Sequence, residues 1–244
     1  IKNFVDHMIL LFNFEKKYFD KEKVSSEFVG HPLLDEDENS KIDLNQIINK
    51  ENSIISIFPG SRKVEIELLM PILIDFVKLM NKKYGNFNYV FHSTKAHFDL
   101  INSTLRKAQL ESCQSICDEK IKNYVLKKSK FAIAKSGTVS LEICNKNIPS
   151  IILYKMNFIN FIIIKALVKT KFANIINIAA NEEVIPELLQ SNCNPKNIFD
   201  NVDSYLQEPN KIKNQLVKIQ NIITKFKTNK SSAELASLSL NRFL

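Results

Sequence analysis

The chain has 244 residues, of which 45% are hydrophobic and 25% charged, so it can bury a sizeable core in one large domain or slightly more. Its formal charge of +8 fits an anionic partner, such as a phosphorylated substrate or an anionic membrane surface, but Lys-rich chains without a dedicated ligand are also basic. The positive charge is mainly scattered lysine with no aromatic-interleaved arginine patch, so we expect no nucleic-acid partner.

The cysteines show neither a metal-binding nor a disulfide pattern. Cys113 and Cys117 are separated by four positions, Cys144 and Cys193 stand apart, and no histidine lies at ligand spacing. Free thiols in a cytoplasmic protein are the expected state. We find no signal peptide and no apolar run long enough to span a bilayer, and the apolar start at Ile1 looks like the interior of a fold.

The amino-terminal segment is predicted to contain two short strands, a helix between them and a turn. These elements are residues 5–12, 14–21, 27–29 and 30–32. The acidic, polar run 35–40 that follows is typical of a linker or an exposed loop. After it, Leu44, Ile47 and Ile48 share one face of a predicted helix.

From residue 53 onward, apolar runs and helical patterns alternate. The predicted strands are 53–58, 89–92, 131–134 and 150–154, with a weaker strand at 115–117. The predicted helices are 64–82, 95–108, 120–129 and a helix that ends at Asn145. Pro71 interrupts the first of these helices, where we expect a kink or a restart. Alternating units of this size predict a doubly wound α/β fold, a parallel sheet with helices on both faces.

The remaining third of the chain is predicted to be mainly helical. Residues 158–168 form an apolar stretch broken by Lys165 and flanked by Lys155, Lys169 and Lys171, a pattern that fits a helix dipping into a membrane surface or meeting acyl chains. The same stretch also fits a buried core helix or a dimer contact. Residues 184–190 are predicted to form a short helix, and 195–244 one or two amphipathic helices.

Two turns carry the residues best suited to chemistry. Pro59–Arg62 closes one predicted strand and precedes Glu65, while Ser136–Thr138 closes another and precedes Glu142. Ligands bind at the carboxyl ends of strands in open α/β sheets, so both turns should line one cleft. Glycine allows close approach of the backbone, the helix starts offer N–H groups, and the Arg62 guanidinium matches a diphosphate.

Each turn also has a plainer interpretation. Gly60 and Gly137 are equally consistent with ordinary turn glycines, Ser136 and Thr138 with helix caps, and Arg62 with a surface arginine. Neither turn matches a GKS/GKT phosphate loop or a GxGxxG fingerprint. The residues alone therefore leave the phosphate site as one of two interpretations.

The two turns belong to a set of short motifs that runs along nearly the whole chain. The motifs are FVGHP at 28–32, FPGSR at 58–62 with Glu65, SGTVSLE at 136–142, LVKT at 167–170 and ELLQ at 187–190. In this order and at this spacing they resemble the lipid A disaccharide synthase family, inverting GT-B-type glycosyltransferases of outer-membrane biogenesis. SGTxxLE alone would fit several related transferases, whereas the combination is specific.

The resemblance implies two Rossmann-like domains with UDP held mainly by the carboxyl-terminal one. Residues 1–32 would then be the last part of the amino-terminal acceptor domain and the crossover, and 33–52 a linker and helix. Residues 53–205 would be the nucleotide-sugar-binding domain, and 206–244 the carboxyl-terminal helices. Most of the acceptor-binding half, with its proposed catalytic acidic residue, has no counterpart in this sequence.

The resemblance also implies a set of site residues, with Arg62 as the catalytic candidate that stabilises the leaving diphosphate. The implied UDP-binding residues are Pro59, Gly60, Ser61, Arg62, Ser136, Gly137, Thr138, Glu142, Asn177, Glu187 and Gln190. Glu142 would lie toward the ribose. Ile176 replaces a family proline and Asn181 a family glycine, and Asn tolerates the left-handed conformation.

The implied reaction joins UDP-2,3-diacylglucosamine to 2,3-diacylglucosamine 1-phosphate, without a metal or other cofactor. The implied location is cytoplasmic, peripheral to the inner membrane of a Gram-negative bacterium, with a homodimer as one arrangement. Three alternatives remain open: an amino-terminal part carried outside this chain, a non-catalytic remnant that at most binds UDP, and another GT-B UDP-sugar transferase. The LVKT and ELLQ motifs disfavour the last of these.

Overall fold

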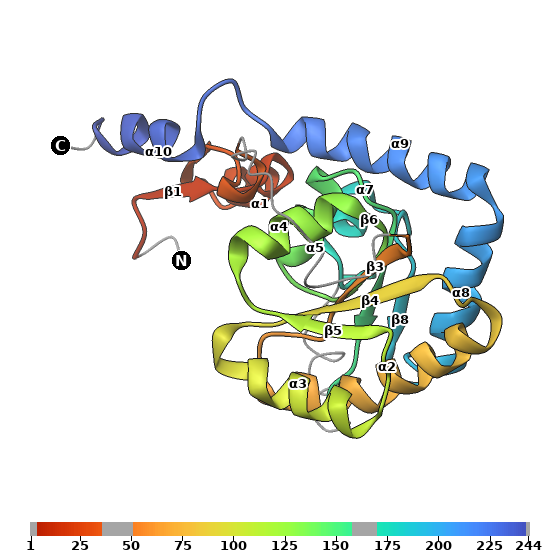
Figure 1. Cartoon of the computed structure of the whole chain (residues 1–244). Helices are drawn as coiled ribbons and strands as arrows, with labels where there is room; N and C mark the ends of the chain where they lie inside the picture. Colours follow the sequence, from red (N-terminus) through yellow and green to blue (C-terminus); the bar gives the residue numbers. More distant parts are fainter. Residues whose placement is uncertain (1–3, 36–50, 158–169, 243–244) are drawn as a thin grey trace.

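A six-stranded parallel sheet, in the order β5-β4-β3-β6-β7-β8, is the centre of the fold (Figure 1). The computed structural model describes residues 4–35, 51–157 and 170–242. The strands are β3 (Ser53–Phe58), β4 (Phe87–His92), β5 (Cys113–Ile116), β6 (Ser129–Lys135), β7 (Ser150–Tyr154) and β8 (Glu187–Leu189). The predicted parallel α/β sheet is therefore confirmed.

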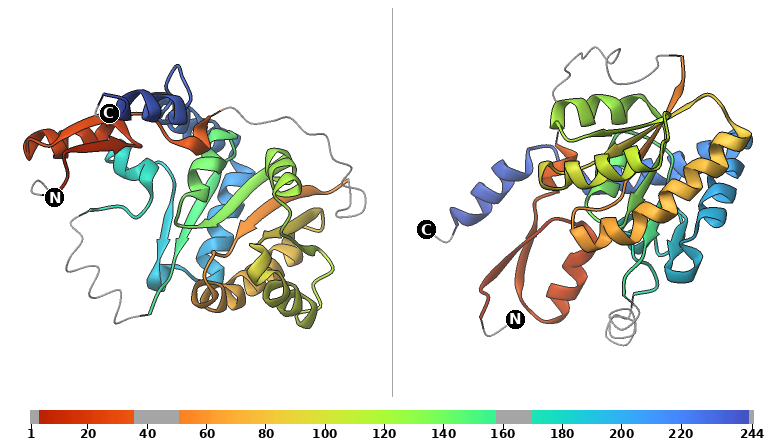
Figure 2. Two further views of the ribbon diagram at one scale, coloured as in Figure 1. Left: turned by 90° about the vertical axis from the view of Figure 1, so that its left-hand side faces the viewer. Right: turned by 60° about the horizontal axis from the view of Figure 1, so that its bottom comes forward.

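Helices cover both faces of this sheet, which explains why its strands are apolar on both sides (Figures 1 and 2). One face packs against α2 (Lys63–Lys83), α3 (Phe98–Lys107) and α8 (Pro195–Gln207). The other packs against α4 (Glu119–Lys128), α5 (Val139–Asn145), α7 (Ile175–Ala180) and α9 (Pro209–Phe226). Successive residues of one strand point to opposite faces of the sheet, so Ile54 and Ile55 belong to different core clusters. The fold is thus doubly wound.

The two ends of the chain lie together beside this main body (Figure 1). The amino-terminal elements are β1 (His7–Leu10), η1 (Asn13–Glu15), α1 (Lys16–Lys21), β2 (Ser25–Phe28) and η2 (Pro32–Leu34). Strands β1 and β2 form a separate parallel sheet. The last helix, α10 (Ser232–Leu240), contacts them, since the Ser239 hydroxyl donates to Glu27 at 2.8 Å and lies 3.0 Å from His7 Nε2.

Three sequence-based predictions need correction. Residues 184–190 are not a helix, because Glu187–Leu189 pairs with β7 as the edge strand β8. Helix α2 does not restart at Pro71, because the carbonyl left without a donor belongs to exposed Glu67, where water can solvate it. The carboxyl-terminal region forms three helices instead of one or two, and α7 was not predicted.

Two predicted features lie outside the described residues. They are the helix with Leu44, Ile47 and Ile48, and the apolar stretch 158–168 with its membrane and dimer interpretations. Within the ranges that the structure does describe, no helix is both long and apolar enough to cross a bilayer.

Candidate functional site

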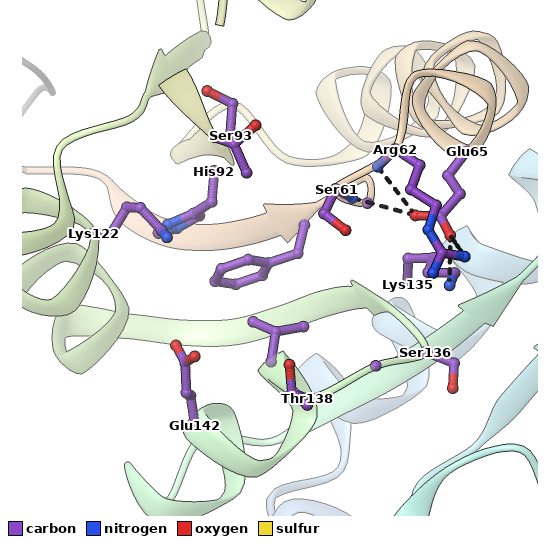
Figure 3. Close-up of a pocket in the computed structure, with 15 residues that line it drawn as sticks. Ser61, Arg62, Glu65, His92, Ser93, Lys122, Lys135, Ser136, Thr138 and Glu142 are labelled. Atoms are coloured by element: carbon purple, nitrogen blue, oxygen red, sulfur yellow. Dashed lines mark hydrogen bonds and ion pairs between the residues drawn. The ribbon is translucent and has the colours of Figure 1, made fainter. Parts of the chain in front are cut away.

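A cavity of about 290 Å³ opens where β3, β4 and β6 end (Figure 3). The register pairs Phe58 with Ala134, so the turns that follow β3 and β6 meet at the same edge of the sheet, as the topology predicts. The lining residues are Phe58, Gly60, Ser61, Arg62, Glu65, His92, Ser93, Thr94, Lys122, Lys135, Ser136, Gly137, Thr138, Val139 and Glu142.

Glu65 holds the first turn together. One carboxylate oxygen accepts from the backbone N–H groups of Ser61 at 3.2 Å and Arg62 at 3.4 Å. The other lies 2.8 Å from Lys135 Nζ and 3.7 Å from the Arg62 guanidinium. Burial acts to raise the pKa of Glu65, but Lys135 and the two backbone N–H groups outweigh it and hold the pKa below its usual value.

Glycine is required at position 60 for two reasons. Its φ is +122°, a conformation that L side chains rarely adopt, and a Cβ would lie 2.7 Å from the Glu65 carboxylate. The sequence-based expectation of free N–H groups here is wrong for Ser61 and Arg62, because Glu65 already accepts from both. What this turn presents to the cavity is therefore chiefly the Arg62 side chain, which is 83% exposed.

Lys135 was not among the residues predicted for the site. It is the last residue of β6, its side chain is 18% exposed, and its ammonium lies over the Tyr154 ring at 5.4 Å. A single lysine carries no pattern, and only its place directly before the Ser136–Thr138 turn could have drawn attention to it. With Arg62 it puts two cations beside the first turn (Figure 3).

The second turn is open toward the cavity. A Cβ added at Gly137 would meet nothing closer than a carbonyl 4.0 Å away, so a ligand can approach the backbone there. Ser136 donates its hydroxyl to the Ala173 carbonyl at 2.9 Å. Thr138 begins helix α5 without a side-chain cap, so its hydroxyl does not serve as the predicted alternative, a helix cap.

Asn177, Glu187 and Gln190 lie outside the cavity lining and support the neighbouring loops. Glu187 accepts from the Ala173 and Asn174 backbone N–H groups at 2.8 and 2.9 Å and from the Asn177 amide at 2.8 Å. Ala173 in turn accepts from Ser136, which ties this network to the second turn.

The other two amides close their loops in the same manner. Asn177 is fully buried, and its carbonyl oxygen accepts from the Val184 and Ile185 N–H groups, both at 2.9 Å. Gln190 exchanges hydrogen bonds with the Met156 backbone. Asn181 adopts the left-handed conformation, with φ of +53°. Direct UDP contacts by Asn177, Glu187 and Gln190 remain predictions.

The far side of the cavity contains residues that the sequence did not single out, among them His92, Ser93 and Lys122 (Figure 3). His92 is 3% exposed and stacks on Phe58, with ring centroids 4.1 Å apart. Burial, and secondarily the charge of Lys122, lower the pKa of His92 to about 3, so its ring is neutral at physiological pH. Glu142 lies on the same side of the cavity (Figure 3).

Metal-ligating residues do not gather at this cavity. No group of three or more His, Cys, Asp or Glu side chains placed to hold a metal ion occurs within residues 4–35, 51–157 and 170–242. All four cysteines are free. Burial raises the pKa of Cys193 to about 11, which keeps this thiol protonated at neutral pH.

The sheet order and the cavity at the carboxyl ends of its strands define the protein as a Rossmann-like, doubly wound α/β domain. Residues 1–240 match the family model described as lipid-A-disaccharide synthetase. The chain belongs to this family.

The relatives support this membership. The lipid-A-disaccharide synthase of Rickettsia prowazekii (strain Madrid E) is 34% identical over 241 residues, which cover 95% of this chain and 62% of the relative. That of Coxiella burnetii (strain RSA 331 / Henzerling II) is 34% identical over 217 residues, covering 86% and 56%. The S. aureus MnaA-UDP co-structure shares the fold, with a TM-score of 0.67 at 14% identity over 97% of this chain and 60% of that one. The chain thus spans about 62% of the length of the first relative.

Proposed function

We propose that this chain carries the UDP-binding part of a lipid A disaccharide synthase. The proposed enzyme transfers 2,3-diacylglucosamine from UDP-2,3-diacylglucosamine to 2,3-diacylglucosamine 1-phosphate and releases UDP. The main observation in support is that Arg62, Lys135 and the two turns line one cavity in a chain of this family. The S. aureus relative in fold was solved with UDP, which supports a UDP-binding role for this fold.

The proposed chemistry needs positive charge where the diphosphate leaves. The acceptor's 6-hydroxyl attacks the anomeric carbon, the bond to the diphosphate oxygen breaks with inversion, and negative charge grows on UDP. Arg62 can donate two parallel hydrogen bonds to the diphosphate, and Lys135 adds a second cation. Electrostatic stabilisation of a developing charge by a preorganised group is worth about 3 kcal/mol. The base that deprotonates the hydroxyl belongs, in this proposal, to the part of the relatives that the chain does not match.

The proposed division of the chain follows from this function. Residues 53–205 form the nucleotide-sugar-binding domain, preceded by the linker and helix 33–52 and followed by the helices in 206–244. Residues 1–32, which include the β1–β2 sheet, are the end of the acceptor domain and the crossover. Proteolysis that releases a stable fragment beginning near residue 53 would support this division.

The proposed site of action is the cytoplasmic surface of the inner membrane, because both substrates carry acyl chains. The formal charge of +8 favours contact with anionic lipids. Co-sedimentation with vesicles of anionic phospholipid, compared with zwitterionic vesicles at the same salt, tests this. Equal recovery with both would contradict a charge-driven association.

Calorimetric titration with UDP tests the nucleotide site itself. The Arg62→Ala variant should bind UDP about 10- to 100-fold more weakly, because it loses a charge-assisted hydrogen bond. Arg106→Ala is the matched control, since Arg106 is an exposed arginine of α3 that does not line the cavity. Absence of UDP binding by the folded chain would contradict the proposal.

Release of UDP from UDP-2,3-diacylglucosamine in the presence of the acceptor, 2,3-diacylglucosamine 1-phosphate, measured with the chain as it stands, tests the transfer. Binding of UDP together with release above the background would support the full reaction. Binding of UDP without any release would restrict the chain's role to holding the nucleotide.

A further inference from the structure

A chain of buried hydrogen bonds leads from the cavity into the sheet. His92 Nε2, at the end of β4, lies 2.8 Å from the Ser56 hydroxyl on β3. The Ser56 hydroxyl lies 2.7 Å from the Ser129 hydroxyl on β6, and Ser129 donates to the Val125 carbonyl at 2.9 Å. Three neighbouring strands therefore contribute one polar group each to this relay.

The relay fixes which nitrogen of His92 carries the proton. The single hydroxyl hydrogen of Ser129 goes to Val125, so Ser129 can only accept from Ser56. The Ser56 hydrogen is thus directed to Ser129, and Ser56 must accept from His92 Nε2–H. A neutral imidazole has only one N–H, so Nδ1 of His92 is an acceptor.

This acceptor has no partner among the described residues. Nδ1 of His92 is shielded from solvent and makes no hydrogen bond in that part of the chain, although the residue lines the cavity. A buried acceptor without a donor is unfavourable, so a ligand that brings a donor gains by satisfying it.

Lys122 is the movable neighbour of this group. Its side chain ends beside the His92 ring in Figure 3, and its ammonium pairs at 2.7 Å with Glu119, a carboxylate that is 74% exposed. The Lys122 side chain is itself 19% exposed, but solvent reaches its partner carboxylate, so a ligand that displaces the lysine gives up an ion pair that is already screened in part.

The position of His92 indicates which part of a ligand reaches it. Arg62, Lys135 and Ser136 lie at one end of the cavity, and His92, Ser93 and Lys122 at the other (Figure 3). A nucleoside diphosphate whose phosphates lie at the cationic end places its nucleoside at the His92 end.

We propose that His92 determines nucleobase specificity, because its Nδ1 accepts a hydrogen bond from the imide N–H of uracil. This inference rests on the proposed UDP site. Uracil carries a donor at N3, whereas cytosine carries an acceptor there, which would face the lone pair of Nδ1. The relay therefore selects UDP over CDP, and Ser56 and Ser129 act as positioning residues.

Calorimetric titration of the full chain with UDP, CDP and N3-methyl-UDP tests this, using two matched variants. In His92→Gln the amide nitrogen replaces Nε2 and still donates to Ser56, but nothing replaces Nδ1. In His92→Asn the side-chain oxygen stands where Nδ1 was. We expect the wild type to prefer UDP to both analogues by about 10-fold or more, His92→Gln to lose that preference, and His92→Asn to retain most of it.

Nitrogen NMR of the histidine rings adds a readout that does not depend on any variant. The Nε2–H form of His92 is expected throughout, with the Nδ1 resonance shifting on addition of UDP but not of pyrophosphate. An Nδ1–H form, or equal UDP and CDP affinities in the wild type, would overturn the inference. The inference would also be overturned if 2′-deoxy-UDP bound more weakly than UDP while N3-methyl-UDP bound equally well, because His92 would then contact the ribose.

Failure of the inference can be told from failure of the proposed function. UDP that binds in an Arg62-dependent way, with affinity unaffected by His92→Gln, leaves the UDP site standing and removes only the role of His92. No UDP binding by the folded wild type overturns both.

Discussion

The ammonium of Lys135 lies 2.8 Å from the carboxylate of Glu65, and this ion pair joins the two turns that close the cavity. The two side chains are 18% and 14% exposed, so solvent screens them only in part. Glu65 also caps the backbone of Ser61 and Arg62. One carboxylate thereby sets the spacing between the turn after β3 and the turn after β6.

Replacing Glu65 by Gln should destabilise the chain. The variant leaves Lys135 partly buried without a counter-charge and weakens the cap on Ser61, so we expect the free energy of unfolding to fall by about 1–3 kcal/mol. Urea unfolding at pH 7 measures this. Glu67→Gln is the control, since Glu67 lies on the same helix and its side chain pairs, within the described part of the chain, only with exposed Lys63 at 3.8 Å. Equal losses in both variants would contradict a special role for Glu65.

The pH dependence should differ in the same experiment. The pKa of Glu65 is lower in the folded chain than its usual value, so its stabilisation is present above the unfolded pKa and is lost as the pH falls through the folded pKa. Wild-type and Glu65→Gln stabilities should therefore converge on acidification. A constant difference down to the lowest pH at which the chain folds would contradict this.

Gly60→Ala should damage both stability and the site. The alanine would have to adopt a φ of +122°, and its Cβ would lie 2.7 Å from the Glu65 carboxylate. Either the turn or the carboxylate must therefore move. We expect a loss of about 1–3 kcal/mol in the free energy of unfolding, together with weaker UDP binding. Gly85→Ala is the control, because a Cβ there meets nothing within 4 Å. Equal thermal midpoints for the two variants would be inconsistent with the observed turn.

Burial of neutral His92 should make the chain acid-sensitive. The pKa of His92 is about 3 in the folded chain and about 6.5 in an unfolded one, so the unfolded state binds more protons between these values. Stability from this group is full above the unfolded pKa and decreases by up to about 1.4 kcal/mol per pH unit below it. His92→Gln should show a shallower decrease between pH 6.5 and pH 5, measured by urea unfolding. Parallel curves for the two proteins would contradict the burial of a neutral ring.

Glu187→Gln should loosen the loop that supports the second turn. The carboxylate accepts from three N–H groups, and an amide would turn a donor toward one of them. We expect faster hydrogen exchange at the Ala173 and Asn174 amides and a loss of about 1–3 kcal/mol in stability. Glu182→Gln is the control, since Glu182 pairs only with Lys218 on the exposed surface among the described residues. Unchanged exchange at Ala173 would show that the network does not hold the loop.

The sequence predicts the parts of the fold that local patterns encode. The buried strands β3, β6 and β7 are apolar runs, and their boundaries differ from the prediction by two residues at most. Strand β8 has only three residues, including Glu187, and exists because it pairs with β7, which no local pattern records. The six-residue α7 is likewise too short to repeat the apolar spacing by which a helix is recognised in a sequence.

At the candidate site, the sequence predicts which turns meet, but it does not predict the side-chain contacts between neighbouring strands. The two turns follow predicted strands, so their meeting was foreseeable. The cap formed by Glu65 depends on the conformation of Gly60. The ion pair between Glu65 and Lys135 depends on the position of the neighbouring strand β6. The relay through Ser56, His92 and Ser129 joins residues far apart in sequence on three neighbouring strands, and only the folded sheet brings them together.

The contact between the two ends of the chain has a mechanical consequence. Two segments pass between the β1–β2 region and the main sheet, and they lie against each other, because a Cβ at Gly30 would be 3.1 Å from the Thr228 hydroxyl. Near the same crossing, Asp35 accepts from the Ser232 hydroxyl at 2.9 Å. Phe12 and Phe14 also pack against Phe226 at the end of α9, with ring centroids 4.9 and 6.0 Å apart, so aromatic contacts hold the β1–β2 region to the main body as well. Any displacement of the β1–β2 region relative to the main sheet would therefore have to break these aromatic and polar contacts first.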